Sequence, residues 1–280
     1  MLFKHKLNNN NTYKSKKDDT SMTIIVGIAC KDGLIMASDS QGMSNRGVDV
    51  KRMDCTKIEI LSENGLKAII GCAGEVPYIN KTIDLIKLKI EEFKVRTCNE
   101  LIDSSEDSID EITKKYGVDR LRKIGLIEKR GQLGSFHSER PDPTLDIIIM
   151  IGCIEDEKPI LHIVLPEGIA EKEENFCSIG SGSAYAEYIL SNLFYDDMTL
   201  KEGVILATHV VEEVKKIDPN VGGDVQIITI NKNGEIETHT KEKCKKLCDD
   251  ISNNNDVLSK VWRSLILNKK TPQQILEFLK

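Results

Sequence analysis

Thr23 is the residue of this chain whose type and position most directly suggest chemistry. It begins the patterned part of the sequence, and Met22 precedes it. If translation began at Met22, removal of that methionine would leave Thr23 with a free α-amine. A threonine hydroxyl is a weak nucleophile that needs an adjacent base, and an α-amine with an ordinary pKa of about 8 is suited to that task. The alternative is that Thr23 only begins a strand, where threonine is a favoured residue.

Asp39 and Lys57 are the charged residues that could assist such a nucleophile. Asp39 ends one apolar segment and Lys57 begins another, so we expect each charge at the rim of a sheet. A lysine paired with a carboxylate beside the threonine hydroxyl would lower the effective pKa of that hydroxyl. The alternative is two solvated charges at strand ends.

The turn between the first two strands decides whether Asp39 and Thr23 share a face. We expect a three-residue turn over residues 31–33, with Gly33 in the left-handed conformation that glycine adopts without strain. Ile25 then lies opposite Asp39, and Thr23 lies diagonally across on the same face.

Gly71 is a candidate for stabilising a developing oxyanion. It lies on the strand expected to pair with that of Lys57, and a glycine offers an unobstructed backbone N–H. The alternative is a strand glycine that allows close packing.

Apolar periodicity predicts the elements that must position these residues. Two capping boxes, at Thr97 and Thr199, predict helix starts. The order of strands, helix pair, strands, helix pair and strand indicates an α+β sandwich of antiparallel sheets covered by helices. Strands are expected over residues 23–30, 34–39, 57–61, 66–72, 144–153, 160–165, 176–179 and 224–230, and helices over 75–94, from 97, near 183 and from 199.

Composition limits the partners and the compartment. The 280 residues carry a net charge of −6 with a pI of about 5.6, which argues against a nucleic-acid partner. The longest apolar run, residues 147–154, is far shorter than the roughly 20 residues that span a membrane. The eight cysteines are scattered and no secretory segment is evident, so we expect reduced thiols, a cytoplasmic location and no metal site.

Both ends of the chain differ from the patterned body. Residues 1–22 are rich in asparagine and lysine and poor in apolar residues, which indicates a disordered leader or propeptide. Residues 23–232 form the expected domain. Residues 233–280 are expected to be a helical extension, whose apolar residues from Val257 onward would pack on their own subunit or on another.

Five segments of the body, taken in order, resemble those of proteasome β-type subunits, which are N-terminal nucleophile hydrolases. The resemblance covers roughly residues 23–232. The segments are Thr23 to Asp39, Cys55-Thr-Lys57-Ile, Ile70-Gly71-Cys-Ala-Gly74, Ile179-Gly-Ser181-Gly-Ser183 and Ile217-Asp218-Pro-Asn-Val-Gly222-Gly223.

The resemblance implies a four-layer αββα sandwich and a threonine-type endopeptidase without cofactors. Thr23 would be the nucleophile and its α-amine the base. Lys57 would lower the hydroxyl pKa, Asp39 would orient Lys57, and Gly71 would form the oxyanion hole.

Supporting and substrate-binding positions also follow from the resemblance. Ser181 and Asp218 match residues that support the threonine. Ile69, two residues before the expected oxyanion glycine, would line the pocket for the substrate side chain and favour apolar side chains. The implied partners are peptide or unfolded-protein substrates and further copies of the chain in a ring, with room for an α-type ring or an ATPase.

Three departures suggest a divergent, stand-alone relative. Val221 replaces a serine of many β subunits, the segment 117–143 is long, and no glycine precedes Thr23. Two alternatives therefore stay open: a catalytically inactive structural subunit, if Thr23 never becomes N-terminal, and an amidase of the same class acting on a small substrate.

Overall fold

The computed structural model describes residues 23–46, 49–118, 144–263, 271, 273 and 274. The expected leader, most of the long segment 117–143 and most of the expected helical extension after residue 263 lie outside the described residues.

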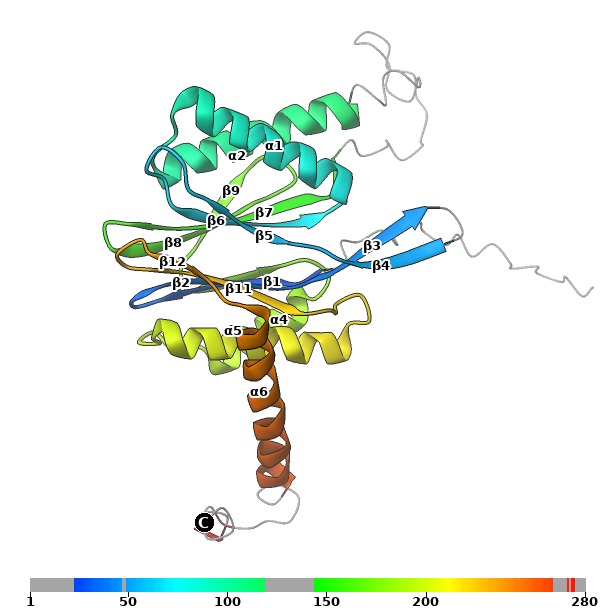
Figure 1. The fold of residues 1–280 in the computed structure, drawn as a ribbon, viewed down its shortest axis with the longest axis vertical. Coiled ribbons are helices and arrows are strands. Elements are labelled where there is room, and N and C mark those ends of the chain that lie inside the picture. Colours follow the sequence, from blue (N-terminus) through cyan, green and yellow to red (C-terminus); the bar gives the residue numbers. More distant parts are fainter. Residues whose placement is uncertain (1–22, 47–48, 119–143, 264–270, 272, 275–280) are drawn as a thin grey trace, which may run out of the picture.

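Two five-stranded antiparallel sheets form the centre of the molecule (Figure 1). The first sheet has the order β10-β1-β2-β11-β12, and the second has the order β5-β6-β7-β8-β9. The strands of the first sheet are β10 (Phe176–Ile179), β1 (Ile25–Cys30), β2 (Gly33–Asp39), β11 (Val225–Asn231) and β12 (Ile236–Thr238). Those of the second are β5 (Ile58–Leu61), β6 (Ala68–Gly74), β7 (Ile147–Glu155), β8 (Lys158–Val164) and β9 (Ala170–Glu173).

The two sheets pack face to face because each presents alternate apolar side chains to the other. Ile25, Met36 and Met150 are fully buried in this layer. Gly27 permits the close approach, since a Cβ at Gly27 would lie 2.8 Å from side-chain atoms of Met150 and Leu161.

Helices cover both outer faces of the sandwich (Figure 1). α1 (Val76–Phe93) and α2 (Cys98–Ile112), which continues into a π-helical turn (Thr113–Val118), pack on the second sheet. α4 (Ser183–Leu193) and α5 (Leu200–Ile217) pack on the first sheet. The capping boxes at Thr97 and Thr199 start α2 and α5 as expected. The predicted four-layer αββα sandwich is confirmed. No helix within the described ranges combines the length and apolarity needed to cross a bilayer.

The turn between β1 and β2 is shorter than expected. Cys30 pairs with Gly33, so residues 31 and 32 alone make the turn, and Ile25 pairs with Ser38 instead of Asp39. Gly33 does not have a positive φ. A glycine is needed at this position because a Cβ would collide with the carbonyl oxygen of Ile230 on the neighbouring strand. The predicted register is therefore wrong by one residue.

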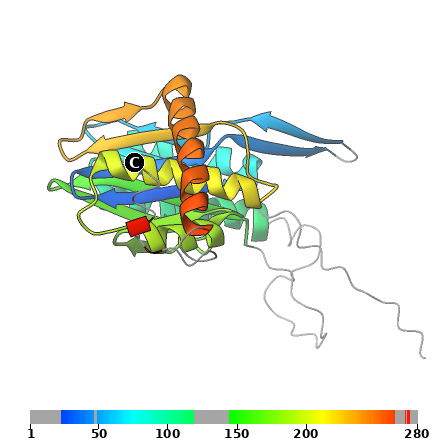
Figure 2. The same cartoon turned by 90° about the horizontal axis from the view of Figure 1, so that it is seen from below.

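A two-stranded hairpin projects from the sandwich and has no counterpart among the predicted elements. It consists of β3 (Gln41–Arg46) and β4 (Asp49–Asp54), and it extends away from the body in both views (Figures 1 and 2). The hairpin occupies most of the chain between Asp39 and Lys57. Its two ends therefore lie beside the two charged candidates.

The C-terminal extension begins inside the body rather than after residue 232. β12 pairs with β11. The long helix α6 (Lys241–Trp262) then buries Cys244 and Ile251 before it continues away from the sandwich (Figure 1). The expected domain boundary thus falls within the first sheet and its helical cover.

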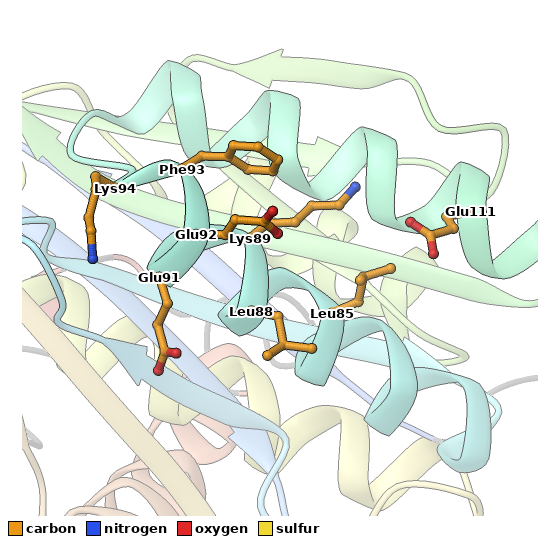
Figure 3. A pocket seen from close by; sticks show the side chains of 8 residues that line it. All are labelled: Leu85, Leu88, Lys89, Glu91, Glu92, Phe93, Lys94 and Glu111. Atoms are coloured by element: carbon orange, nitrogen blue, oxygen red, sulfur yellow. The ribbon is translucent and has the colours of Figure 1, made fainter.

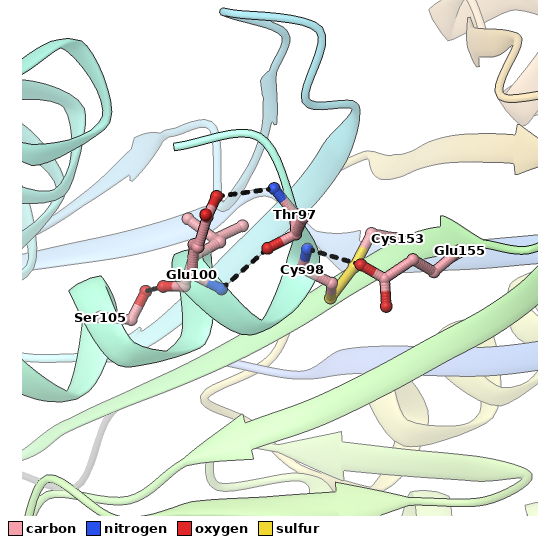
Figure 4. The surroundings of a disulfide bond; sticks show 7 residues. Thr97, Cys98, Glu100, Ser105, Cys153 and Glu155 are labelled. Carbon is pink, nitrogen blue, oxygen red and sulfur yellow. Dashed lines mark hydrogen bonds between the residues drawn. A yellow bond between two sulfur atoms is a disulfide. The ribbon is translucent and has the colours of Figure 1, made fainter. Parts of the chain in front are cut away.

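A disulfide joins Cys98, at the start of α2, to Cys153 on β7 (Figure 4). The Cα atoms are 6.4 Å apart although 55 positions separate the residues in sequence. The Cys98 N–H also donates to Glu155 Oε1 at 3.1 Å. The expectation that all eight thiols are reduced is therefore wrong for this pair, whereas the other six cysteines are free.

Alkylation of the denatured protein checks the disulfide. We expect six modified cysteines without a reducing agent and eight after reduction, read by intact mass. Reduction should lower the free energy of unfolding by about 2–4 kcal/mol, because the bridge closes a long loop in the unfolded chain. Cys55→Ser, which leaves the bridge intact, should show the same loss on reduction. Eight modified cysteines before reduction would exclude the bridge.

Candidate active site

The carboxylate of Asp39 is the centre of a group of polar contacts at the end of β2. It is fully buried and accepts four hydrogen bonds. Oδ1 accepts from the N–H of Ile24 at 3.0 Å and from Lys57 Nζ at 2.6 Å. Oδ2 accepts from the N–H groups of Gly222 at 3.0 Å and Gln41 at 3.2 Å. A buried carboxylate needs such a full set of donors to remain ionised at acceptable cost.

The corrected register explains how Asp39 reaches this position. Asp39 pairs with Ile24, and its N–H donates to the Ile24 carbonyl at 3.3 Å. Because β2 ends at Asp39, strand alternation does not dictate where the carboxylate points. The surrounding donors hold it beside Lys57 instead.

Lys57 lies immediately before β5 and its side chain is only 7% exposed. Burial lowers the pKa of the Lys57 ammonium, and the Asp39 carboxylate opposes this effect. The backbone of Lys57 is held on both sides. Its N–H donates to Gln226 Oε1 at 3.1 Å, and its carbonyl accepts from the N–H of Cys72 at 3.1 Å.

Thr23 precedes β1 and is 4% exposed. Its carbonyl accepts from the N–H of Gly182 at 3.2 Å, and its nitrogen donates to Ser181 Oγ at 3.4 Å. The turn before α4 approaches Thr23 this closely because Gly180 has a φ of 102° and no Cβ; a Cβ there would collide with the Thr23 carbonyl.

Asp218 connects the end of α5 to the same group. Ser181 Oγ donates to Asp218 Oδ2 at 2.8 Å, and Asp218 Oδ1 accepts from the N–H of Asn220 at 2.9 Å. Val221 is 4% exposed and belongs to the apolar layer beneath α4 and α5. It supplies packing where a serine would supply a hydroxyl.

The surroundings of Gly71 and Ile69 favour roles in packing. The N–H of Cys72 faces Lys57, so the alternation of amides along a strand turns the N–H of Gly71 toward β7, where Gly71 pairs with Met150. A Cβ at Gly71 would lie 2.8 Å from Met36 Sδ, which is the close-packing alternative. Ile69 is fully buried between the sheets.

Gly74 is the glycine of this strand that sequence reasoning missed. By the same alternation, the N–H of Gly74 points to the side of β6 on which β5 and Lys57 lie. β5 begins opposite Gly71, so β6 continues for three residues beyond the start of β5. Gly74 has a φ of 133°, and a Cβ would collide with the Asp146 carbonyl. The sequence feature that could have drawn attention to Gly74 is its position as the last residue of the apolar strand.

The structure brings Thr23, Asp39, Lys57, Ser181 and Asp218 together from five separate segments. Gln226 and Gly222 also contact this group; Gln226 was not singled out from the sequence, and Gly222 was named only within a matching segment, without a role. Their signal was weak, because an amide side chain on a strand and a glycine pair in a turn are common features.

The described surface has at least two hollows. The larger of these two, of about 690 Å³, lies over α1 and α2 and is lined by residues such as Leu88 and Phe93 (Figure 3). The smaller, of about 280 Å³, lies directly beside Asp39 and is lined by Ser40, Gln41, Arg52, Met53, Asp54, Gly223 and Asp224. Within the described part of the chain, no group of three or more His, Cys, Asp or Glu side chains could hold a metal ion.

Removing the central carboxylate tests whether the pair holds this region together. We expect Asp39→Ala to lower the free energy of unfolding by about 3–5 kcal/mol, because Lys57 would keep a buried charge without its partner. Asp224→Ala is the matched control. Asp224 pairs with Lys241 at 3.2 Å but both side chains are more than 60% exposed, so a loss below about 1 kcal/mol is expected. Equal losses in urea denaturation would contradict the dominant role of Asp39.

Comparison with known proteins adds an independent observation. A family model described as "Proteasome subunit" matches residues 132–230. The proteasome subunit beta 1 of Caldivirga maquilingensis is 39% identical over 210 residues, covering 75% of this chain and 89% of the relative. The proteasome subunit beta 1 of Thermococcus onnurineus is 24% identical over 220 residues, covering 79% and 94%.

Solved structures share the fold at lower identity. Anbu (ancestral beta-subunit) from Yersinia bercovieri superposes with a TM-score of 0.68 at 15% identity, covering 87% of this chain and 97% of that one. Anbu from Hyphomicrobium sp. strain MC1 gives a TM-score of 0.61 at 18% identity, covering 85% and 97%. Given the 39% identity across most of both sequences, together with the shared sandwich, this chain belongs to the proteasome β-subunit family.

Proposed function

We propose that this chain is a threonine-type endopeptidase whose nucleophile is Thr23, exposed as the N-terminus after release of residues 1–22. The observation that carries the proposal is the Asp39 carboxylate. One buried oxygen of this group binds both the Lys57 ammonium and the N–H of Ile24, the residue next to Thr23. The Asp39 carboxylate therefore holds the Lys57 ammonium beside the start of β1, the strand that Thr23 precedes.

The proposed reaction uses the new α-amine as the base. The amine accepts the proton of Thr23 Oγ while this oxygen attacks the carbonyl carbon of a peptide bond. The Lys57 charge favours the deprotonated oxygen, and the N–H of Gly74 is the proposed donor to the tetrahedral oxyanion. The amine then protonates the leaving amino group, and water hydrolyses the resulting ester.

Ser181 and Asp218 are proposed to hold the α-amine. In the full chain the Thr23 nitrogen already donates to Ser181 Oγ, which in turn donates to Asp218. After release of the leader, the same hydroxyl would bind the free amine. Val221 makes this arrangement one hydroxyl smaller than in many family members.

The cellular setting is part of the proposal. We propose peptides and unfolded proteins as substrates, a cytoplasmic location, and self-association into a ring that encloses the sites. A second ring of α-type subunits or an ATPase would be the partner that controls access. The small hollow beside Asp39 is the proposed place for part of the substrate.

Substitution of Thr23 and Lys57 tests the chemistry in protein whose intact mass shows loss of residues 1–22. We expect Thr23→Ala to abolish hydrolysis of fluorogenic peptides and Thr23→Ser to retain part of it, because serine keeps the hydroxyl. Lys57→Ala should lower kcat by at least about 100-fold, since the oxyanion and hydroxyl lose their cation. Lys67→Ala, at an exposed turn position, should behave as the parent.

The competing functions give different results in the same experiment. Retention of residues 1–22 on every copy would support an inactive structural subunit and defeat the peptidase. Hydrolysis of small amides without cleavage of long peptides would support an amidase. Full activity of Lys57→Ala, with its fold confirmed by circular dichroism, would remove Lys57 from the mechanism.

Light scattering at low micromolar concentration tests the assembly. We expect a particle several times the 31.4 kDa of one chain, because a closed ring needs repeated contacts between unlike faces of identical subunits. A monodisperse monomer that still degrades unfolded protein would contradict the proposed enclosure.

A further inference from the structure

Residues 55–57 connect the projecting hairpin to β5 and belong to neither sheet. β4 ends at Asp54, and β5 begins at Ile58. Cys55 and Lys57 are half-buried, whereas Thr56 between them is exposed. The N–H of Cys55 donates to the Ser40 carbonyl at 2.8 Å, and the carbonyl of Lys57 accepts from Cys72.

The side-chain amide of Gln226 satisfies two further backbone groups of the connection. Gln226 Oε1 accepts from the N–H of Lys57 at 3.1 Å, and Gln226 Nε2 donates to the carbonyl of Cys55 at 2.8 Å. One side chain thus bonds on both sides of Thr56, in the way a neighbouring strand would. A glutamate could not do this, because an ionised carboxylate has no donor for the Cys55 carbonyl.

Gln226 is itself held in the first sheet. It lies on β11 directly opposite Ser38 of β2, and Ser38 Oγ donates to Gln226 Oε1 at 3.3 Å. Ser38 is fully buried, and the next residue of β2 is Asp39. The backbone pairing of β2 with β11 therefore positions both partners of the ion pair, Asp39 directly and Lys57 through the Gln226 amide, and it does not require the Ser38 hydroxyl.

We propose that Gln226 is a positioning residue of the active site, whose amide sets the backbone of Lys57 so that the ammonium meets Asp39. This inference rests on the proposed function for its kinetic consequences, but the placement of Lys57 stands apart from it. The amide also separates Lys57 from the hairpin. A two-stranded hairpin is marginally stable alone, and its movements would otherwise reach Lys57 through residues 55 and 56.

The experiment compares Gln226→Leu and Gln226→Glu with the control Ser38→Ala. Leucine removes both bonds to the connection. Glutamate keeps only the bond to the N–H of Lys57. Alanine at position 38 removes the hydroxyl contact to Gln226 and leaves both bonds to the connection in place. All variants are made in the full chain and assayed after release of residues 1–22.

We expect Gln226→Leu to lower kcat at least 30-fold with KM within twofold of the parent, and Gln226→Glu to fall between the two. The acidic limb of the kcat profile should move to higher pH in Gln226→Leu, because a displaced Lys57 charge no longer favours the neutral α-amine. Lys57 interacts with the Asp39 carboxylate and the Cys55 thiol, and Asp54 interacts with that thiol; none of these groups is altered. Ser38→Ala should match the parent in kcat, in KM and in the position of the acidic limb.

A second measurement needs no peptidase activity. Acetic anhydride applied to the native protein, followed by peptide mass mapping, reports how accessible the Lys57 amine is. We expect slow acetylation of the buried Lys57 in the parent and in Ser38→Ala, and acetylation at least tenfold faster in Gln226→Leu. Exposed Lys67 should react at one rate in all variants.

The outcomes separate the two proposals. A parent that hydrolyses no peptide, while Gln226→Leu still exposes Lys57 to acetylation, defeats the proposed function and retains the positioning role. Parent-like acetylation of Gln226→Leu overturns the positioning role. A fall in kcat of Gln226→Leu with an unchanged acidic limb would also overturn the positioning role, because Gln226 would then contribute only to the stability of the fold.

Discussion

A buried ion pair between Asp39 and Lys57 is the interaction on which the arrangement of this site depends. Two charges removed from water are tolerated only with close contact and a complete set of hydrogen bonds. The 2.6 Å contact meets the first condition, and three backbone N–H groups meet the second. These donors come from the start of β1, the start of β3 and the turn before β11. The pair therefore requires that three distant segments end at the same point.

The sandwich makes that convergence rigid. The two sheets approach closely at Gly27 and Gly71, where any side chain would meet sulfur or methyl groups of the facing sheet. Close packing of this kind resists compression because the interior has few voids. The first sheet carries Asp39, and the second carries the strand that follows Lys57. Fixing the sheets against each other thus fixes the distance between the two charges.

In contrast to the two packed sheets, the hairpin between Asp39 and Lys57 is a separate two-stranded sheet. It projects from the body (Figure 2). β3 begins two residues after Asp39, and β4 ends three residues before Lys57. The contacts of Ser40 and Gln226 with the connection form a border between this projection and the site. The family resemblance rests on segments at the core of the site, and Ser40 and Gln226 lie outside those segments.

The sequence by itself determined the layers, the order of elements and the residue types of the site, because apolar periodicity and capping boxes are local properties. It placed Thr23, Asp39 and Lys57 through matching segments. Tertiary structure decided the rest. The β1–β2 register depends on the two-residue turn at residues 31 and 32, and Gly33 is needed because a Cβ there would collide with β11. The glycine whose amide faces the Lys57 edge follows from strand alternation, and the Cys98–Cys153 bridge follows from the packing of α2 on β7. Each depends on contacts between segments far apart in sequence, which no local pattern records.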